Sequence, residues 1–357
     1  MSTICLCMIV KNESRVIGRC LDSVRGLIDS WIISDTGSTD GTQSLIRSAL
    51  EGIPGELHQD DWVNFGHNRT HNIQHAFGRA DYLLLLDADH TVRLESPLPA
   101  LTGTSYMLRH EGNLEYRVKR LVRGDIDWNY VGATHEYLNT EEEDKQELLD
   151  EIVISDFADG GSRHDKFERD AALLADELAR NPKNDRAVFY LAQTMRDMGN
   201  GAEAIELYER RAMMGGWGEE VYVALLEAGI LRAELGDWPG GMECLTKAWE
   251  SRPQRLEACY QLSSRLRKMR RHNAAYIFAK AGIGRPVPAG DVLFTNPWVY
   301  RWGLLFELSV SSYWIGEYAE SVWACDQLLG LADLPEVYRR QTVINRGFSI
   351  GRLGARQ

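Results

Sequence analysis

The N-terminal half of the chain alternates short, largely apolar runs with segments whose apolar residues recur at helical spacing. Strands are predicted at Ile4–Val10, Ser30–Ser34, Glu56–Gln59 and Tyr82–Leu86. Helices are predicted between them, at Glu13–Gly26, at Gly41–Leu50 and over residues 66–78. Strands that alternate with helices in this way predict an α/β domain with a mainly parallel sheet covered by helices. The following stretch, Ser105–Leu138, is irregular and rich in strand-forming residues.

The chain changes character after Gly160, and from Asp165 it is nearly all helix-forming. Four turn positions align at intervals of 37, 34 and 46 residues: Gly199, Gly236, Arg270 and Gly316. A small residue stands seven residues before each turn and another stands five residues after it. These pairs are Ala192 and Ala204, Gly229 and Gly241, Ser263 and Ala275, and Ser309 and Ser321. The pattern resembles tetratricopeptide repeats with a degenerate third unit, and it predicts an all-α domain at 165–357 after a first domain at 1–164.

The composition is that of an ordinary globular protein. The 357 residues are 44% hydrophobic and 26% charged, which excludes disorder for the bulk of the chain. Acidic residues outnumber basic ones by 52 to 40, which gives a net charge of −12. This balance argues against a nucleic-acid partner, because phosphates are bound by clustered lysines and arginines.

Membrane and redox signals are weak. Met1–Val10 is apolar but short and runs directly into Lys11, so we expect neither a membrane span nor a signal peptide there. Six cysteines show no zinc-binding spacing, and Cys5 and Cys7 stand two apart on a predicted strand, where they cannot readily bridge. We expect buried free thiols and a cytoplasmic protein.

The sharpest chemical motif is Asp87-Ala88-Asp89, directly after the apolar strand that ends at Leu86. In open α/β sheets, ligands bind at the carboxyl ends of the strands. Carboxylate oxygens suit Mg²⁺ or Mn²⁺, and such a cation would neutralise a diphosphate. The alternative is a strand-end cap bonded to backbone N–H groups. The position of the motif favours a metal site.

A second polar element, Ser34–Thr42, follows the second strand. A tight turn and a helix cap explain Gly37, Asp40 and Gly41. Asp35 stands at the strand end, at the same sheet edge as Asp87. We therefore expect Asp35 to accept hydrogen bonds from a nucleobase or a ribose.

Four stretches carry a family signature in their order and spacing: Cys7–Glu13, Asp35–Thr42, Trp62–Phe65 with Arg69, and Asp87–Asp89. They resemble the family 2 inverting glycosyltransferases, whose A-type nucleotide-sugar-binding fold is Rossmann-like. The resemblance covers about residues 2–164, and the repeats resemble a subgroup with a tetratricopeptide tail. Asn64, Thr70 and His90 depart from the residues usual in the family.

The resemblance implies a role for each matched residue. Contacts with the donor nucleotide would come from Asn12, Glu13, Asp35, Arg69 and Asp87. Metal ligation would come from Asp89, with Asp87 on the ribose or the metal. The implied cofactor is a divalent metal, Mn²⁺ or Mg²⁺.

An inverting transfer also needs a group that takes the proton of the acceptor hydroxyl. The segment Trp128–Glu136 resembles a family element that ends in His-Glu, so we assign Glu136 as the base, with His135 as its orienter or a metal ligand. A strand pair satisfied by its neighbours is the structural alternative. Asp156 is the rival base and could instead be a third metal ligand. Arg163 and Lys166 could hold the departing diphosphate or be solvated charges at a helix start.

The function expected from these features is metal-dependent, inverting transfer of a sugar from a UDP- or GDP-sugar to a glycan, lipid-linked or protein acceptor. The repeats would bind the acceptor or form a homodimer. One alternative is nucleotidyl transfer onto a sugar phosphate, although that reaction usually needs a Gly-rich basic loop where this chain has Lys11–Ser14. The other is an inactive domain on a protein-binding repeat scaffold. Asp35, Asp87 and Asp89 argue against it, because gathered carboxylates repel unless a cation or polar ligand uses them.

His67, His71 and His75 recur every four residues on one predicted helix. Such spacing can bind Zn²⁺. No cysteine or acidic residue stands at a matching spacing, so a polar helix face is the preferred interpretation.

Overall fold

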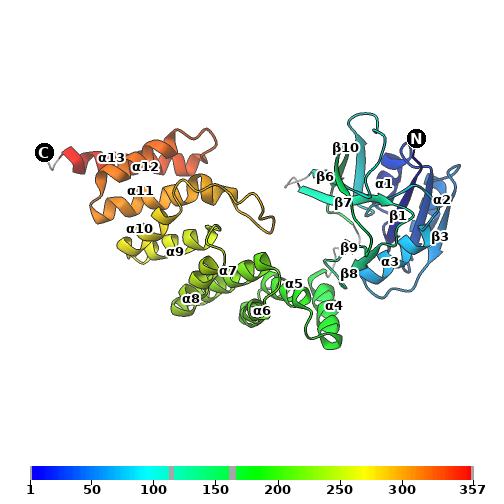
Figure 1. The fold of residues 1–357 in the computed structure, drawn as a ribbon, viewed down its shortest axis with the longest axis horizontal. Coiled ribbons are helices and arrows are strands. Elements are labelled where there is room, and N and C mark those ends of the chain that lie inside the picture. Colours follow the sequence, from blue (N-terminus) through cyan, green and yellow to red (C-terminus); the bar gives the residue numbers. More distant parts are fainter. Residues whose placement is uncertain (1, 112–115, 161–165, 355–357) are drawn as a thin grey trace. The chain divides into compact units, whose positions relative to one another are not determined.

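The computed structural model describes residues 2–111, 116–160 and 166–354. The chain divides into two compact units, Met1–Pro182 and Lys183–Gln357. Figure 1 traces strands and helices through the first unit and helices alone through the second.

Unit 1 is built on an eight-stranded sheet in the order β3-β2-β1-β4-β7-β6-β10-β5. Its first half is parallel and contains β1 (Ile4–Val10), β2 (Ser30–Asp35), β3 (Gly55–Gln59) and β4 (Tyr82–Leu85). Its second half is mixed and contains β5 (His90–Leu94), β6 (Ser105–Glu111), β7 (Tyr116–Arg123) and β10 (Gln146–Asp156). A separate two-stranded sheet pairs β8 (Asn129–Val131) with β9 (Tyr137–Asn139).

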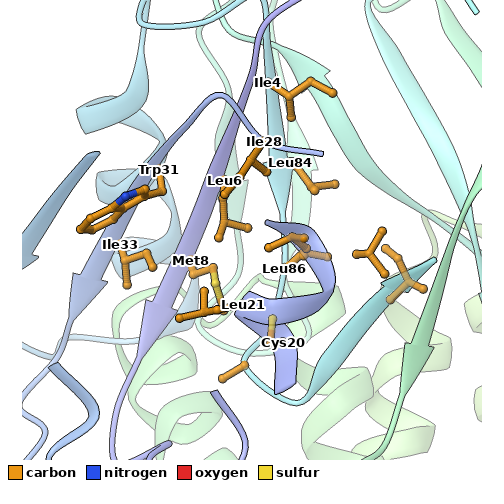
Figure 2. Close-up of a cluster of buried hydrophobic side chains, with 14 of the residues drawn as sticks. Ile4, Leu6, Met8, Cys20, Leu21, Ile28, Trp31, Ile33, Leu84 and Leu86 are labelled. Atoms are coloured by element: carbon orange, nitrogen blue, oxygen red, sulfur yellow. The ribbon is translucent and has the colours of Figure 1, made fainter. Parts of the chain in front are cut away.

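Helices cover both faces of the parallel half. On one face, α1 (Ile17–Val24) buries Cys20 and Leu21 against strand residues such as Leu6 and Met8 (Figure 2). The second helix, α2 (Thr42–Ala49), adds Ile46 to the same core. Residues from α3 (Phe65–Ala76) pack with strand residues that alternate to the opposite side of the sheet. The strands can therefore be apolar on both sides, as their sequences are.

The α/β fold class and the strand positions predicted from the sequence are confirmed. The predicted helix at Glu13–Gly26 is shorter in the structure, because a turn precedes it, in which Ser14 N–H donates to the carboxylate of Asp40. The third helix begins at Phe65, directly after its N-cap residue Asn64. The side chain of Asn64 accepts a hydrogen bond from His67 N–H at 2.8 Å.

Helices make up the rest of the chain. Unit 1 ends with α4 (Lys166–Arg180). Unit 2 contains α5 (Asp185–Asp197), α6 (Gly201–Met214), α7 (Gly218–Glu234), α8 (Trp238–Ser251), α9 (Glu257–Lys268), α10 (His272–Ala281), the π-helical turn η2 (Val299–Gly303), α11 (Leu304–Ile315), α12 (Tyr318–Leu329) and α13 (Glu336–Gly354). The α8 helix ends at Ser251, two residues before Pro253, which cannot continue a helix.

The repeat alignment is visible in the backbone of unit 2. All four aligned turn residues have positive φ, between 61° and 92°. Arg270 is thus forced into the left-handed conformation that glycine adopts easily in the other three units. The small residues meet as predicted: Ser263 Oγ donates to Ala275 O at 2.8 Å, and Ser321 Oγ donates to Ser309 O at 2.6 Å. These contacts confirm a series of helical hairpins.

All six cysteines are buried and free, as expected. Among the residues that the structure describes, no helix combines the length and the apolar character needed to cross a membrane. The domain boundary proposed after residue 164 precedes α4, whereas the compact units divide after Pro182.

Candidate active site

A cavity of about 720 Å³ opens where β1, β2 and β4 end. Its wall is completed by α3, by the turn between β8 and β9 and by the first turns of α4, all of which belong to unit 1. The structure brings eight of the predicted site residues to this wall: Asn12, Glu13, Arg69, Asp87, Asp89, His135, Glu136 and Asp156. The ninth, Asp35, lies just outside it, next to the lining residue Thr36.

Asp87 is held between two arginines. One carboxylate oxygen pairs with Arg69, and the other lies 3.0 Å from Nη2 of Arg120. Burial alone would raise the pKa of Asp87, but the two guanidinium groups outweigh it and hold that pKa well below its usual range. Both oxygens of Asp87 are therefore engaged by arginine in this structure.

Arg69 links Asp87 to the predicted base. Its Nε lies 2.8 Å from Oε1 of Glu136, and its guanidinium lies over the ring of Tyr130. Burial opposes the charge on Arg69, yet the carboxylates of Asp87 and Glu136 raise its pKa above the ordinary value. Arg69 thus fixes two acidic side chains that come from distant parts of the sequence.

A cluster of two carboxylates and one imidazole lies on the same wall. Ligand atoms of Asp89, His90 and Asp156 all lie within 4.8 Å of one another. The pairing of β5 with β10 brings them together, because it sets His90 opposite Asp156. Two carboxylates and one imidazole form a donor set that suits Mn²⁺. These three residues therefore fit a divalent cation, and Asp87 lies outside the group.

The loops after β1 and β2 are locked together. Asn12 N–H donates to Ser38 Oγ, and its side-chain oxygen accepts from Thr39 N–H, both at 2.8 Å. Asp35 is 1% exposed, and its Oδ1 accepts hydrogen bonds from the backbone N–H groups of Gly37 and Ser38. Its Oδ2 is buried and has no hydrogen-bond partner among the residues that the structure describes. A buried carboxylate oxygen in this state can accept a hydrogen bond from a ligand.

Sequence reasoning missed three side chains at this wall: His90, Arg120 and Arg169. His90 directly follows the Asp-x-Asp motif and could have been proposed as a ligand on that ground. Arg120 stands in a strand rich in Arg and Lys, with no local signal to single it out. Lys166 lines the cavity, whereas Arg163 lies outside the described residues.

A protein-family model matches the part of the chain that forms most of this cavity's sheet edge. Residues 5–101 match the family model described as Glycosyl transferase family 2. Residues 5–101 are therefore similar to a family 2 glycosyltransferase domain. The match contains the Asp35 loop, Arg69 and the Asp-x-Asp motif, and it ends before Glu136 and Asp156.

Two curated proteins are similar to parts of this chain. A TPR repeat-containing protein of Synechococcus elongatus is 34% identical over 150 residues, which cover 39% of this chain and 36% of that protein. The SPbeta prophage-derived glycosyltransferase SunS of Bacillus subtilis is 22% identical over 226 residues, 58% of this chain and 53% of that protein. The chain thus spans between about a third and a half of the length of these relatives. Among solved structures, a tetratricopeptide repeat protein from Parabacteroides merdae is similar with a TM-score of 0.39 and 15% identity, over 54% of this chain and 68% of that one.

Proposed function

We propose that this protein is a metal-dependent, inverting glycosyltransferase that moves a sugar from a nucleotide diphosphate-sugar to an acceptor hydroxyl. The observation that carries the proposal is the grouping of Asp89, His90 and Asp156 on the wall of one cavity, in a unit whose residues 5–101 match the family 2 glycosyltransferase model. A divalent cation held there would neutralise the charge that develops on the diphosphate leaving group.

Basic side chains on the same wall support a diphosphate in this cavity. Lys11, Lys166 and Arg169 all line it, and Arg169 also lies 3.5 Å from the carboxylate of Asp170. The ammonium and guanidinium groups of these residues would bind phosphate oxygens as point charges or as forked donors. Arg69 and Arg120 are already paired with Asp87, so we assign them to holding Asp87 in position.

The donor nucleotide would lie toward the ends of β1 and β2. The buried Oδ2 of Asp35 supports this assignment, because a ribose hydroxyl or the N–H of a base would supply the donor that it lacks. Uracil and guanine both carry such an N–H, which agrees with a UDP- or GDP-sugar. Asn12 and Glu13 line the cavity from the neighbouring loop.

We assign the proton acceptor to Glu136. It lies on the wall formed by the turn between β8 and β9, and its ion pair with Arg69 fixes its position. His135 beside it has a positive φ of 51° and would orient the acceptor or the cation. Asp156 belongs with Asp89 and His90, so we propose it as a metal ligand rather than as the base.

The described residues that line this cavity belong to unit 1. We therefore propose that the repeats bind the acceptor, a glycan, a lipid-linked sugar or a protein, or that they pair two copies of the chain. The six buried free thiols agree with a cytoplasmic location, which is part of the proposal. An inactive domain on a repeat scaffold is the alternative that the experiment must exclude.

Calorimetry with UDP and GDP, with and without Mn²⁺, tests the proposal on the full chain. We expect one nucleotide to bind tightly only with Mn²⁺, and Asp89→Ala to abolish this metal dependence. Glu243→Ala, an exposed change on α8, serves as the matched carboxylate control and should bind as the unchanged protein does. If neither nucleotide binds, or if Asp89→Ala binds with unchanged affinity, the proposed site is wrong.

A further inference from the structure

A second group of metal-ligating side chains lies outside the cavity. Asp60 directly follows β3, and α3 places His71 and His75 one turn apart. The Oδ2 atom of Asp60 lies 3.6 Å from Nδ1 of His71 and 3.5 Å from Nε2 of His75. All three ligand atoms lie within 4.8 Å of one another. The fold thus supplies the acidic partner that local sequence spacing does not show.

These distances are too long for hydrogen bonds, which join nitrogen and oxygen at about 2.7–3.2 Å. Within the described part of the chain, Asp60 Oδ2 and His75 Nε2 are both buried without a hydrogen-bond partner. Around a tetrahedral Zn²⁺, with bonds of about 2.0–2.1 Å to nitrogen and oxygen, neighbouring ligand atoms lie about 3.4 Å apart. The observed separations therefore match the edge of a metal tetrahedron better than they match direct pairing.

We propose that Asp60, His71 and His75 bind a Zn²⁺-class cation at a site separate from the one at Asp89. Three protein ligands would leave the fourth position to water, and the side chain of His71, which is 45% exposed, admits solvent there. His67, the remaining histidine of the row, lies farther away, with its ring 6.1 Å from that of His71.

The competing explanation is ion pairing between Asp60 and protonated histidines. A direct ion pair of this kind would bring nitrogen and oxygen to hydrogen-bond distance, and the separations of 3.6 Å and 3.5 Å exceed that distance. The His58 ring is stacked on His75 with centroids 3.9 Å apart, which restricts the position of the His75 ring. The geometry of the three side chains therefore favours the metal.

The site would act on structure rather than on chemistry, because none of its three residues lines the cavity. It would fasten the segment after β3 to the third helix, and these two elements carry Trp62, Phe65 and Arg69 into the cavity wall. Asp60 N–H also donates to the carbonyl of Asp35 at 3.0 Å. A cation here would therefore hold together the part of the wall that surrounds the proposed nucleotide site.

Co²⁺ provides the test, because it replaces Zn²⁺ and gives strong visible absorption in a tetrahedral site. The full chain, stripped with a chelator, is titrated with Co²⁺ alone. We expect a tetrahedral spectrum that Zn²⁺ displaces, and a loss of affinity of at least about tenfold in His71→Gln and His75→Gln. Zn²⁺ should raise the Tm of the unchanged protein by at least about 3 °C more than it raises that of His71→Gln.

Two controls separate this site from the others. Asp89→Asn removes the proposed catalytic cation and should keep the Co²⁺ spectrum, and His272→Gln removes a histidine of unit 2 and should also keep it. His71 is half exposed, so His71→Gln tests the site even if His75→Gln fails to fold. The proposal is overturned if the spectrum is absent, if it survives in His71→Gln, or if it disappears in Asp89→Asn.

Discussion

Gly229 and Gly241 face each other across α7 and α8 at a separation that admits no side chain. A Cβ added to Gly241 would lie 2.8 Å from the carbonyl oxygen of Gly229, and one added to Gly229 would lie 3.0 Å from the carbonyl oxygen of Gly241. Both positions are inside helices, where glycine is otherwise unfavourable. Close helix packing therefore explains why the second repeat has glycine at both of its small positions.

The first prediction uses this contact. Gly241→Ala should destabilise unit 2 by about 1–3 kcal/mol, because the added methyl group meets backbone atoms that cannot move away cheaply. Gly347→Ala in α13 is the matched control, since a Cβ there meets no atom within 4 Å. It should stabilise by about 0.5–1 kcal/mol through helix propensity. Chemical denaturation measures the free energy of unfolding of both variants. A Gly241→Ala protein as stable as the Gly347→Ala protein would contradict the packing argument.

The second prediction concerns acid stability. His110 on β6 is 1% exposed, and neither of its ring nitrogens has a hydrogen-bond partner in residues 2–111, 116–160 and 166–354. Burial, with the neighbouring Arg120 and His90, lowers the pKa of His110 to about 3. The unfolded chain takes up this proton near pH 6.5 and the folded chain does not. His110 should therefore favour folding above pH 6.5, and this contribution should be lost as the pH falls from 6.5 toward 3.

His110→Phe preserves a flat ring against His90 and Tyr116 and removes the titration. Denaturant unfolding in metal-free buffer between pH 7 and pH 5 measures the effect. The unchanged protein should lose up to about 1.4 kcal/mol per pH unit more than the variant below pH 6.5. Equal slopes for the two proteins would show that His110 is protonated in the folded state.

Local sequence patterns predicted most of the backbone. The turn at Arg270 could be placed because small residues recur at a fixed distance from it, although the residue itself gives no signal. Likewise, Asp87 and Asp89 could be placed at a sheet edge because a fully apolar strand precedes them. Such features depend on neighbours within one hairpin or one strand-helix unit, so the sequence displays them.

Contacts between distant segments could not be predicted in the same way. Arg120 reaches Asp87 because β7 pairs antiparallel to β4, and nothing in either strand encodes that pairing. His90 meets Asp156 through the register of β5 and β10. Asp60 lies close to His71 because α3 packs beside the segment that follows β3. In each case the site depends on which side chains the strand register or the packing of a helix brings together. These long-range contacts cannot be read from the local pattern of one sequence.

The last prediction separates the base from the metal ligands. Glu136 is fixed by Arg69, and Asp156 lies with Asp89 and His90. Glu136→Gln keeps the shape of the side chain and removes its ability to take a proton. Nucleotide and Mn²⁺ binding should survive, while sugar transfer should fall by about 10²–10⁴-fold.

Asp156→Asn should show the opposite pattern, with weaker Mn²⁺-dependent nucleotide binding and a lower transfer rate that excess Mn²⁺ partly restores. Calorimetry and single-turnover transfer, measured on both variants, separate the two effects because one reports binding and the other reports chemistry. An Asp156→Asn protein that binds donor normally but transfers nothing, beside a fully active Glu136→Gln protein, would reverse the two assignments. The pairing of Glu136 with Arg69 would then serve only to hold the turn between β8 and β9 against α3.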